Sequence, residues 1–203
     1  MQYAIIGSGQ IGAALARAFA HVNIEIIIAN TRGPGSLASL TKELGRSVVP
    51  LSIQDAYNAD MIFIAVPFRA HKDVAKQFKQ WNDKIVVDVT NTLDLTSKER
   101  EDLLGGQLSS EVVSKAFVGA RLVKAFNHLP AKLLGANPPV EGQRQAVFLS
   151  SNDADASAAV AAVATKLGFA PIELGRLDQG GVPLHAVDGR PGALLFQNLV
   201  KFG

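Results

Sequence analysis

Short runs of apolar residues, most of them β-branched, alternate along the chain with segments in which apolar residues recur at helical spacing. The first two runs cover 3–6 and 24–29, and residues 11, 14, 15, 18 and 19 between them form one apolar helix face. This is the pattern of a βαβ unit, whose crossover should be right-handed. Further runs predict strands at 47–50, 61–66, 85–89, 121–126, 146–149 and 170–174. Eight strands with helices between them predict an α/β fold with a doubly wound, mostly parallel sheet.

Polar residues at the boundaries of these elements predict helix caps. Ser52 and Asp55 have the spacing of a capping box for a short helix before the fourth strand. Asn152 is expected to cap an alanine-rich helix over 153–167, and Gly168 to end it.

The length of 203 residues fits one domain with a modest C-terminal elaboration. We therefore expect a single dinucleotide-binding domain over 1–203 with an extension at about 179–203. Two softer stretches interrupt the pattern. One is a predicted surface loop at 135–145, and the other is a loop at 179–183 that precedes an amphipathic segment at 193–200.

Composition narrows the classes of function. The 20 basic and 18 acidic side chains are interspersed, so no basic face indicates a nucleic-acid partner. Cysteine is absent, which excludes thiolate catalysis, and the four histidines lie too far apart in the sequence for a local pair of metal ligands. We therefore expect no metal site. No apolar run approaches the length of about 20 residues that spans a bilayer, and no signal peptide precedes the first strand. We expect a soluble, cytoplasmic protein with no membrane partner.

A glycine motif lies between the first strand and the first helix, with the sequence Gly7-Ser8-Gly9-Gln10-Ile11-Gly12. In a GxGxxG turn the first glycine permits the tight turn, the second lets a pyrophosphate approach, and the third lets the helix pack against the sheet. The phosphates would accept hydrogen bonds from the N–H groups of Gln10 and Ile11, at the positive end of the helix dipole. Inside the first βαβ unit, the motif predicts a Rossmann-type fold that binds a dinucleotide.

The end of the second strand distinguishes the two nicotinamide cofactors. Selectivity for NAD usually comes from Asp or Glu there, whereas this chain has Asn30, Thr31 and Arg32, followed by Ser36. Amide and hydroxyl groups can donate to a 2′-phosphate, and Arg32 can add a charge-assisted contact. The sequence therefore predicts NADP(H). The alternative is that Arg32 is a solvated residue of a Gly-Pro turn.

Later strand ends supply further candidates, because ligands gather at the carboxyl ends of parallel strands. Ala65, Val66 and Pro67 would form an apolar wall beside the adenosine ribose, although Pro67 could simply end the strand. Thr90 and Asn91 would lie toward the nicotinamide, although Asn91 could instead shape the following loop.

The sixth strand ends in the densest polar cluster after the glycine motif. Asn127 and His128 are catalytic candidates that could orient the nicotinamide carboxamide or contact the hydride acceptor. Alternatively, Asn127 caps a helix that opens near Pro130. Lys124 fits a structural role as well as a catalytic one, and we assign no general acid or base.

Together the glycine motif, Asn30-Thr31-Arg32, Ala65-Val66-Pro67 and the segment 124–127 resemble the NADP-dependent deazaflavin oxidoreductases. Their relatives include the reductase domains of six-transmembrane metalloreductases. The resemblance covers about residues 2–175, whereas 179–203 matches no pattern of the family. It implies NADPH at the glycine turn with the 2′-phosphate near Thr31 and Arg32 and the nicotinamide near Asn127. It also implies hydride exchange with a flavin- or deazaflavin-type second substrate, and a homodimer.

Hydride transfer between two redox cofactors needs close, parallel rings and little side-chain chemistry, so the lack of an acid–base pair is expected. Neither tyrosine has a lysine four residues later, which disfavours a short-chain dehydrogenase. The sequence therefore predicts an NADP-dependent oxidoreductase. Two alternatives stay open: an NADP-binding sensor without turnover, and an imine or small-carbonyl reductase resembling pyrroline-carboxylate reductase.

Overall fold

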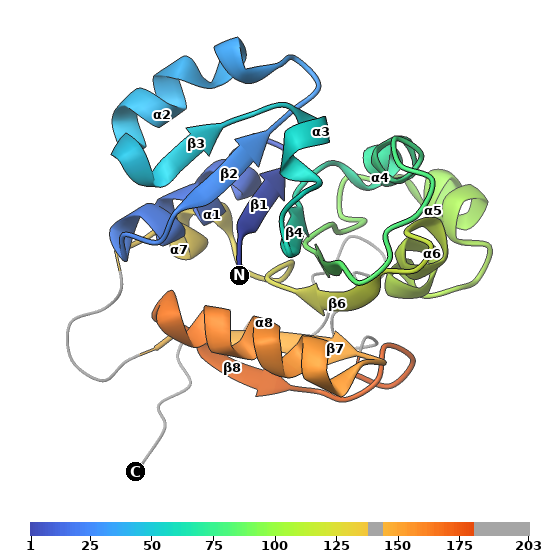
Figure 1. Cartoon of the computed structure of the whole chain (residues 1–203). Helices are drawn as coiled ribbons and strands as arrows, with labels where there is room; N and C mark the ends of the chain where they lie inside the picture. The colour runs from blue at the N-terminus through green and yellow to red at the C-terminus, as the bar shows by residue number, and fades with distance from the viewer. Residues whose placement is uncertain (138–143, 181–203) are drawn as a thin grey trace.

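The computed structural model describes residues 1–137 and 144–180 and is built around one eight-stranded sheet (Figure 1). The strand order is β3-β2-β1-β4-β5-β6-β7-β8, and every neighbouring pair is parallel except β6 with β7. The strands are β1 Tyr3–Ile6, β2 Ile26–Ala29, β3 Val48–Pro50, β4 Met61–Ile64, β5 Ile85–Asp88, β6 Arg121–Ala125, β7 Ala146–Ser151 and β8 Ala170–Glu173. The predicted doubly wound, mostly parallel Rossmann-type sheet is confirmed.

Helices connect the strands. The α-helices are α1 Gln10–His21, α2 Ala38–Leu44, α3 Ile53–Ala56, α4 His71–Ala75, α5 Ser97–Leu104, α6 Ser109–Ala116, α7 Ala131–Leu134 and α8 Ala154–Lys166. Short 3₁₀ turns, η1 Pro34–Leu37, η2 Gly45–Ser47 and η3 Phe68–Ala70, precede or follow α2 and α4.

The alternation of side chains along each strand divides the core into two layers. Ile5 joins the cluster that α1, α2 and α8 cover, whereas Ala4 and Ile6 join the cluster beneath α3, α4 and α6. Every residue of β2, β4 and β5 is buried, and all of them are apolar except Asp88 at the end of β5. The sheet is therefore covered on both faces along its centre.

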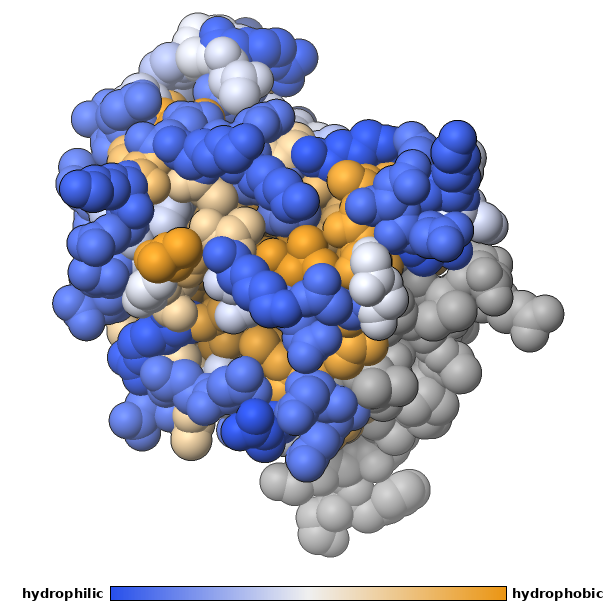
Figure 2. All heavy atoms as spheres, turned by 90° about the vertical axis from the view of Figure 1, so that its right-hand side faces the viewer, coloured by the Kyte–Doolittle hydropathy of each residue, from blue (hydrophilic) through white to orange (hydrophobic). Residues whose placement is uncertain are grey.

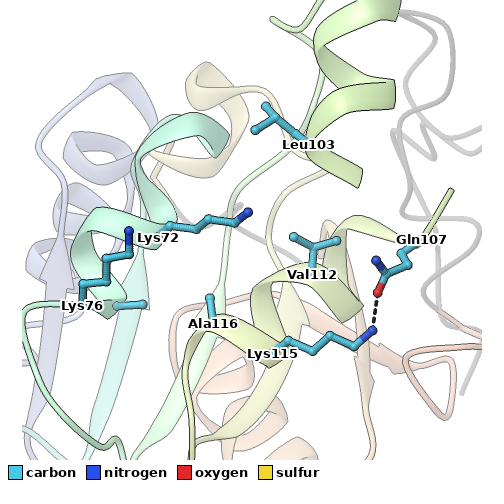
Figure 3. Close-up of a pocket in the computed structure, with 8 residues that line it drawn as sticks. Lys72, Lys76, Leu103, Gln107, Val112, Lys115 and Ala116 are labelled. Carbon is cyan, nitrogen blue, oxygen red and sulfur yellow. Dashed lines mark hydrogen bonds between the residues drawn. The ribbon is translucent and has the colours of Figure 1, made fainter. Parts of the chain in front are cut away.

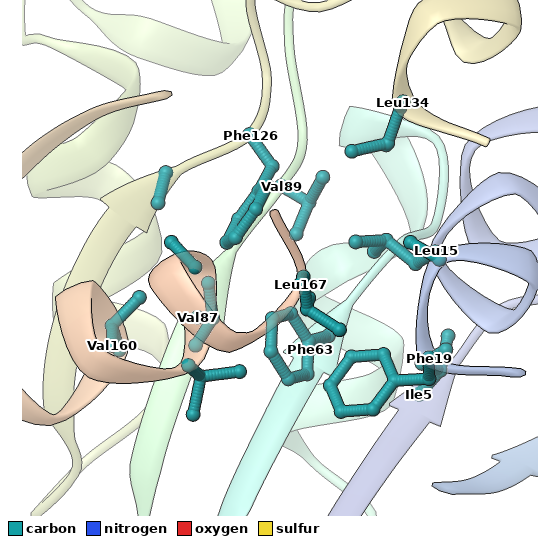
Figure 4. Packing of buried hydrophobic residues seen from close by; sticks show 14 of the residues in the cluster. Ile5, Leu15, Phe19, Phe63, Val87, Val89, Phe126, Leu134, Val160 and Leu167 are labelled. Carbon is teal, nitrogen blue, oxygen red and sulfur yellow. The ribbon is translucent and has the colours of Figure 1, made fainter. Parts of the chain in front are cut away.

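Aromatic rings fill the middle of the first layer. Phe63 lies between Phe19 and Phe126, with ring centroids 5.6 and 5.9 Å away (Figure 4). All three rings are fully buried, and Phe126 continues the chain of contacts to Phe169 at 5.9 Å. This packing holds α1 and the segment that follows α8 against the central strands that carry the candidate site.

The predicted caps have different outcomes. Ser52 accepts a hydrogen bond from the Asp55 N–H at 3.1 Å and caps α3 as predicted. The prediction that Asn152 caps α8 is wrong, because Asp153 takes that role and accepts from the Ala156 N–H at 2.9 Å. Asn152 instead accepts from the Leu177 N–H at 3.1 Å, and so holds the chain that follows β8.

Several predictions concern residues outside the described ranges. Residues 138–143 of the predicted loop at 135–145 lie there, as do 181–203, which include most of the C-terminal extension and the segment 193–200. Within the described ranges, no helix combines the length and apolar character needed to cross a bilayer. Residues 1–137 and 144–180 also contain no group of three or more His, Asp or Glu side chains that could hold a metal ion.

Candidate functional site

The glycine motif forms the turn from β1 into α1, and its outer glycines are required by packing. Gly7 has φ +115°, and a Cβ on it would lie 2.2 Å from the carbonyl oxygen of Ala65. A Cβ on Gly12 would lie 1.9 Å from the carbonyl oxygen of Gly7. Both contacts are far inside van der Waals distance, so only glycine lets β1, the end of β4 and α1 meet this closely.

Gly9 differs from both because the space beside it is open. It is the N-cap residue of α1 with φ −72° and ψ −168°, and no atom lies within 4 Å of the position that its Cβ would take. No side chain of the described residues caps α1, and its first turn contains no acidic residue. The N–H groups of Gln10 and Ile11 lack intrahelical acceptors, so this helix end can accept an anion.

One half of a groove opens from this turn toward β2. It is a cavity of about 310 Å³ lined by the glycine turn, by the ends of β2 and β4, and by one face of α4. Val66 and Pro67 form part of its wall. Asp73 and Gln77 from the α4 segment also line it, and sequence analysis missed both.

Polar side chains gather where this cavity meets the end of β2. The Asn30 amide nitrogen donates to the hydroxyl oxygens of Ser8 at 2.8 Å and Ser36 at 3.0 Å, and its Oδ1 accepts from the Arg32 N–H at 2.9 Å. The Arg32 guanidinium lies 3.4 Å from the Ser8 hydroxyl oxygen. Thr31, between Asn30 and Arg32, lines the same cavity. Four of the predicted residues thus form one hydrogen-bonded cluster that includes the cation Arg32. They are Ser8, Asn30, Arg32 and Ser36.

Arg32 is the charged member of that cluster, and its charge is not neutralised locally. In the described part of the chain no carboxylate lies within 4.0 Å of its guanidinium, whereas Arg17 and Arg121 each pair with one carboxylate and Arg69 pairs with two. The end of β2 therefore presents a cation together with hydroxyl and amide groups, a combination suited to a phosphate.

The second half of the groove continues toward β5. It is a cavity of about 350 Å³ that shares Gly9, Ala65, Val66 and Pro67 with the first and extends to Thr90 and Asn91. The two halves meet at the open side of Gly9. The groove therefore passes along the carboxyl ends of four neighbouring strands, as expected for an extended dinucleotide site.

Asn127 and His128 lie outside the lining of both halves. Asn127 is buried after β6, and α7 begins after Pro130 without a side-chain cap, so the alternative in which Asn127 caps that helix is not supported. The His128 ring packs on Phe148, and its Nε2 lies 3.2 Å from the Ala146 carbonyl oxygen. Burial lowers the pKa of His128, which favours the neutral imidazole.

A separate cavity of about 340 Å³ lies on the other side of α4, between that helix and α5 and α6. Lys72 and Lys76 reach it from the α4 segment, and Lys115 extends from α6 toward Gln107 (Figure 3). On this face of the molecule hydrophobic residues are surrounded by hydrophilic ones (Figure 2). Its lining includes no helix N-terminus and no glycine turn, so it lacks the fixed backbone donors that the groove offers to a dinucleotide.

Comparison with known proteins agrees with this geometry. Residues 2–92 match the family described as "NADP oxidoreductase coenzyme F420-dependent". The metalloreductase STEAP3 of Rattus norvegicus is 32% identical over 174 residues, which are 85% of this chain and 33% of the rat protein. The chain thus spans about a third of the length of that relative.

Solved structures share the fold. A hypothetical protein from Sinorhizobium meliloti is 43% identical with a TM-score of 0.88, over 100% of this chain and 96% of that one. A proposed F420-dependent NADP reductase from Arthrobacter sp. FB24 is 25% identical with a TM-score of 0.70, over 87% of this chain and 86% of that one. An imine reductase from Pseudomonas sp., 20% identical with a TM-score of 0.62, covers 86% of this chain and 55% of its own, and shares the fold.

Proposed function

This chain belongs to the coenzyme F420-dependent NADP oxidoreductase family, a family of NADP-dependent oxidoreductases, and from that premise we propose a specific role for the groove. The groove binds NADP(H) in an extended conformation. The protein then transfers a hydride between NADPH and a flavin- or deazaflavin-type acceptor.

The observation that carries this proposal is the pairing of the open Gly9 position with the cluster around Arg32. The pyrophosphate lies against the N–H groups of Gln10 and Ile11, where no side chain occupies the space beside Gly9. The 2′-phosphate lies beside Arg32, within reach of the Thr31 and Ser8 hydroxyls. These two anion sites line one cavity and fit the adenosine half of NADP.

The nicotinamide half continues past Val66 and Pro67 toward Thr90 and Asn91. Asn127, buried at the neighbouring strand end, is a further candidate contact for the carboxamide. The bound nicotinamide supplies the hydride chemistry. The contribution of this chain is to bind the cofactor, to orient its ring and to keep one face open to the acceptor.

The choice of acceptor rests on the family and on the composition of the groove. Its described lining offers hydroxyl, amide and carboxylate groups but no histidine or tyrosine to protonate a carbonyl or imine. Transfer to a flavin-type ring needs no such proton donor in the hydride step. A single domain over the whole chain and a homodimer, as the family resemblance implies, complete the proposal.

The test is NADPH oxidation measured in parallel with FMN, a deazaflavin, a ferric chelate and a cyclic imine. Turnover with FMN or the deazaflavin, and none with the imine, is the expected result. Turnover with the imine alone would replace the proposal by an imine reductase. Tight NADPH binding without turnover of any acceptor would replace it by an NADP-binding sensor.

A further inference from the structure

Two opposite charges are buried side by side beneath the second half of the groove. Asp88 ends β5 and Lys124 lies on β6, where the two residues are register partners in the sheet. The Lys124 ammonium lies 3.0 Å from Oδ2 of Asp88, and the side chains are 2% and 0% exposed. Neither side chain reaches the groove, so neither can contact a ligand there.

Both charges instead hold one residue of the groove wall. Oδ1 of Asp88 accepts hydrogen bonds from the Thr90 N–H at 2.9 Å and from the Thr90 hydroxyl at 2.7 Å. The Lys124 ammonium donates to the Thr90 carbonyl oxygen. Thr90 is therefore fixed through its N–H, its hydroxyl and its carbonyl at once, and it lines the second cavity together with Asn91.

The far end of the same loop is fixed at the surface. Asp94 pairs with Arg69 at 2.7 Å, and Arg69 also contacts Glu99 of α5 at 2.9 Å. The segment from Thr90 to Asp94 is thus anchored at both ends, with the buried anchor at the groove.

Stability alone gives a weak reason for such a pair. Replacing a buried ion pair by apolar residues of similar volume is often neutral or stabilising, because the cost of removing two charges from water offsets their attraction. On the same face of β5 and β6, the neighbouring residues Val86 and Leu122 belong to the apolar layer beneath α3, α4 and α6, which would accept an apolar replacement. What such a replacement cannot supply is the set of three hydrogen bonds to Thr90.

We propose that the Asp88–Lys124 ion pair is a positioning device that fixes Thr90 and Asn91 against the nicotinamide end of the groove. This inference rests on the proposed function, because it assigns the second cavity to the nicotinamide half of NADP(H). Asp88 and Lys124 act through Thr90 and are positioning residues, not catalytic ones.

The test compares two ligands that share the adenosine half. NADPH occupies the whole groove, whereas 2′,5′-ADP lacks the nicotinamide half. In the double variant Asp88→Leu/Lys124→Met, we expect the affinity for NADPH to fall about tenfold, the effect of one or two misplaced hydrogen bonds. The affinity for 2′,5′-ADP should stay within about twofold, because the adenosine half of the groove keeps its contacts.

Three further variants keep the test decisive. Thr90→Val should reproduce the selective loss of NADPH affinity, whereas Thr90→Ser keeps the hydroxyl and should retain it. The control Arg121→Met/Asp153→Asn removes the ion pair between the amino end of β6 and the start of α8, and both affinities should survive. If Asp88→Leu/Lys124→Met proves too unstable to purify, the two Thr90 variants decide the outcome.

The outcomes separate this inference from the proposed function. Unchanged NADPH affinity in Thr90→Val and in the Asp88/Lys124 variant, or equal losses for both ligands, would overturn the positioning role while leaving NADP binding intact. Wild-type protein that binds neither ligand would overturn the proposed function, and the inference with it.

Discussion

A substitution at Gly9 separates cofactor binding from folding, because the structure leaves open space beside this residue. Gly9→Val puts a side chain where no atom lies within 4 Å of the Cβ position, and φ −72° suits an L-residue. Valine is a poorer N-cap than glycine, but it restricts the unfolded chain, and each effect amounts to less than about 1 kcal/mol. The free energy of unfolding should therefore change by less than about 1 kcal/mol.

Binding should respond very differently to the same change. The valine side chain would occupy the approach of the pyrophosphate to the N–H groups of Gln10 and Ile11. Two charge-assisted hydrogen bonds contribute about 1.5–3 kcal/mol each, so their loss should weaken NADPH binding at least about 100-fold.

Urea denaturation and NADPH fluorescence titration measure the two quantities on the same preparation. Gly12→Ala is the contrasting variant, because its Cβ would lie 1.9 Å from the Gly7 carbonyl oxygen and the turn itself must deform. We expect Gly12→Ala to lose stability as well as binding. Gly9→Val protein that folds normally and binds NADPH with wild-type affinity would refute the placement of the pyrophosphate.

Three further predictions test the specificity cluster, the core and one helix cap. Arg32→Ala should weaken NADP binding about 10- to 100-fold and leave NAD binding within about twofold. The control Lys76→Gln lies outside the groove and should change neither affinity. Equal losses for both cofactors would show that Arg32 does not contact the 2′-phosphate. Phe63→Ala should lower the free energy of unfolding by about 3–5 kcal/mol in urea denaturation, because the ring is fully buried, and a loss below about 1 kcal/mol would contradict the packing. The Arg121 guanidinium and the α8 N–H groups hold the pKa of Asp153 well below its usual value, so Asp153→Ala should cost about 1 kcal/mol at neutral pH. A carboxyl group with a lowered pKa stabilises the fold above its unfolded pKa of about 3.9 and loses that contribution as the pH falls further. The difference in the free energy of unfolding between variant and wild type should therefore shrink below about pH 4. A difference that stays constant with pH would count against the ion pair.

The sequence predicted the sheet well because its signal is local. Buried parallel strands need consecutive apolar, β-branched residues, and each of the eight predicted runs forms a strand. The predicted runs are longer than several strands, since residues 65–66, 89 and 126 leave the sheet at the end of β4, β5 and β6. Apolar character alone does not distinguish a residue in the sheet from one that lines the groove above it.

Features that depend on distant contacts could not be predicted in the same way. Asn152 and Asp153 are both good cap residues, and the choice depends on Arg121, which binds Asp153 from 32 residues away. Asp73 and Gln77 line the groove only because of how α4 packs beside β4. The hydrogen bonds of Asp88 and Lys124 to Thr90 likewise require the three-dimensional pairing of β5 with β6.

Isothermal titration calorimetry of the wild-type protein with NADPH and with NADH tests the central claim most directly. The cluster around Arg32 and the open turn at Gly9 predict saturable binding of NADPH, with NADH at least about tenfold weaker because it lacks the 2′-phosphate. Absence of measurable heat with both nucleotides, or tighter binding of NADH, would contradict the account.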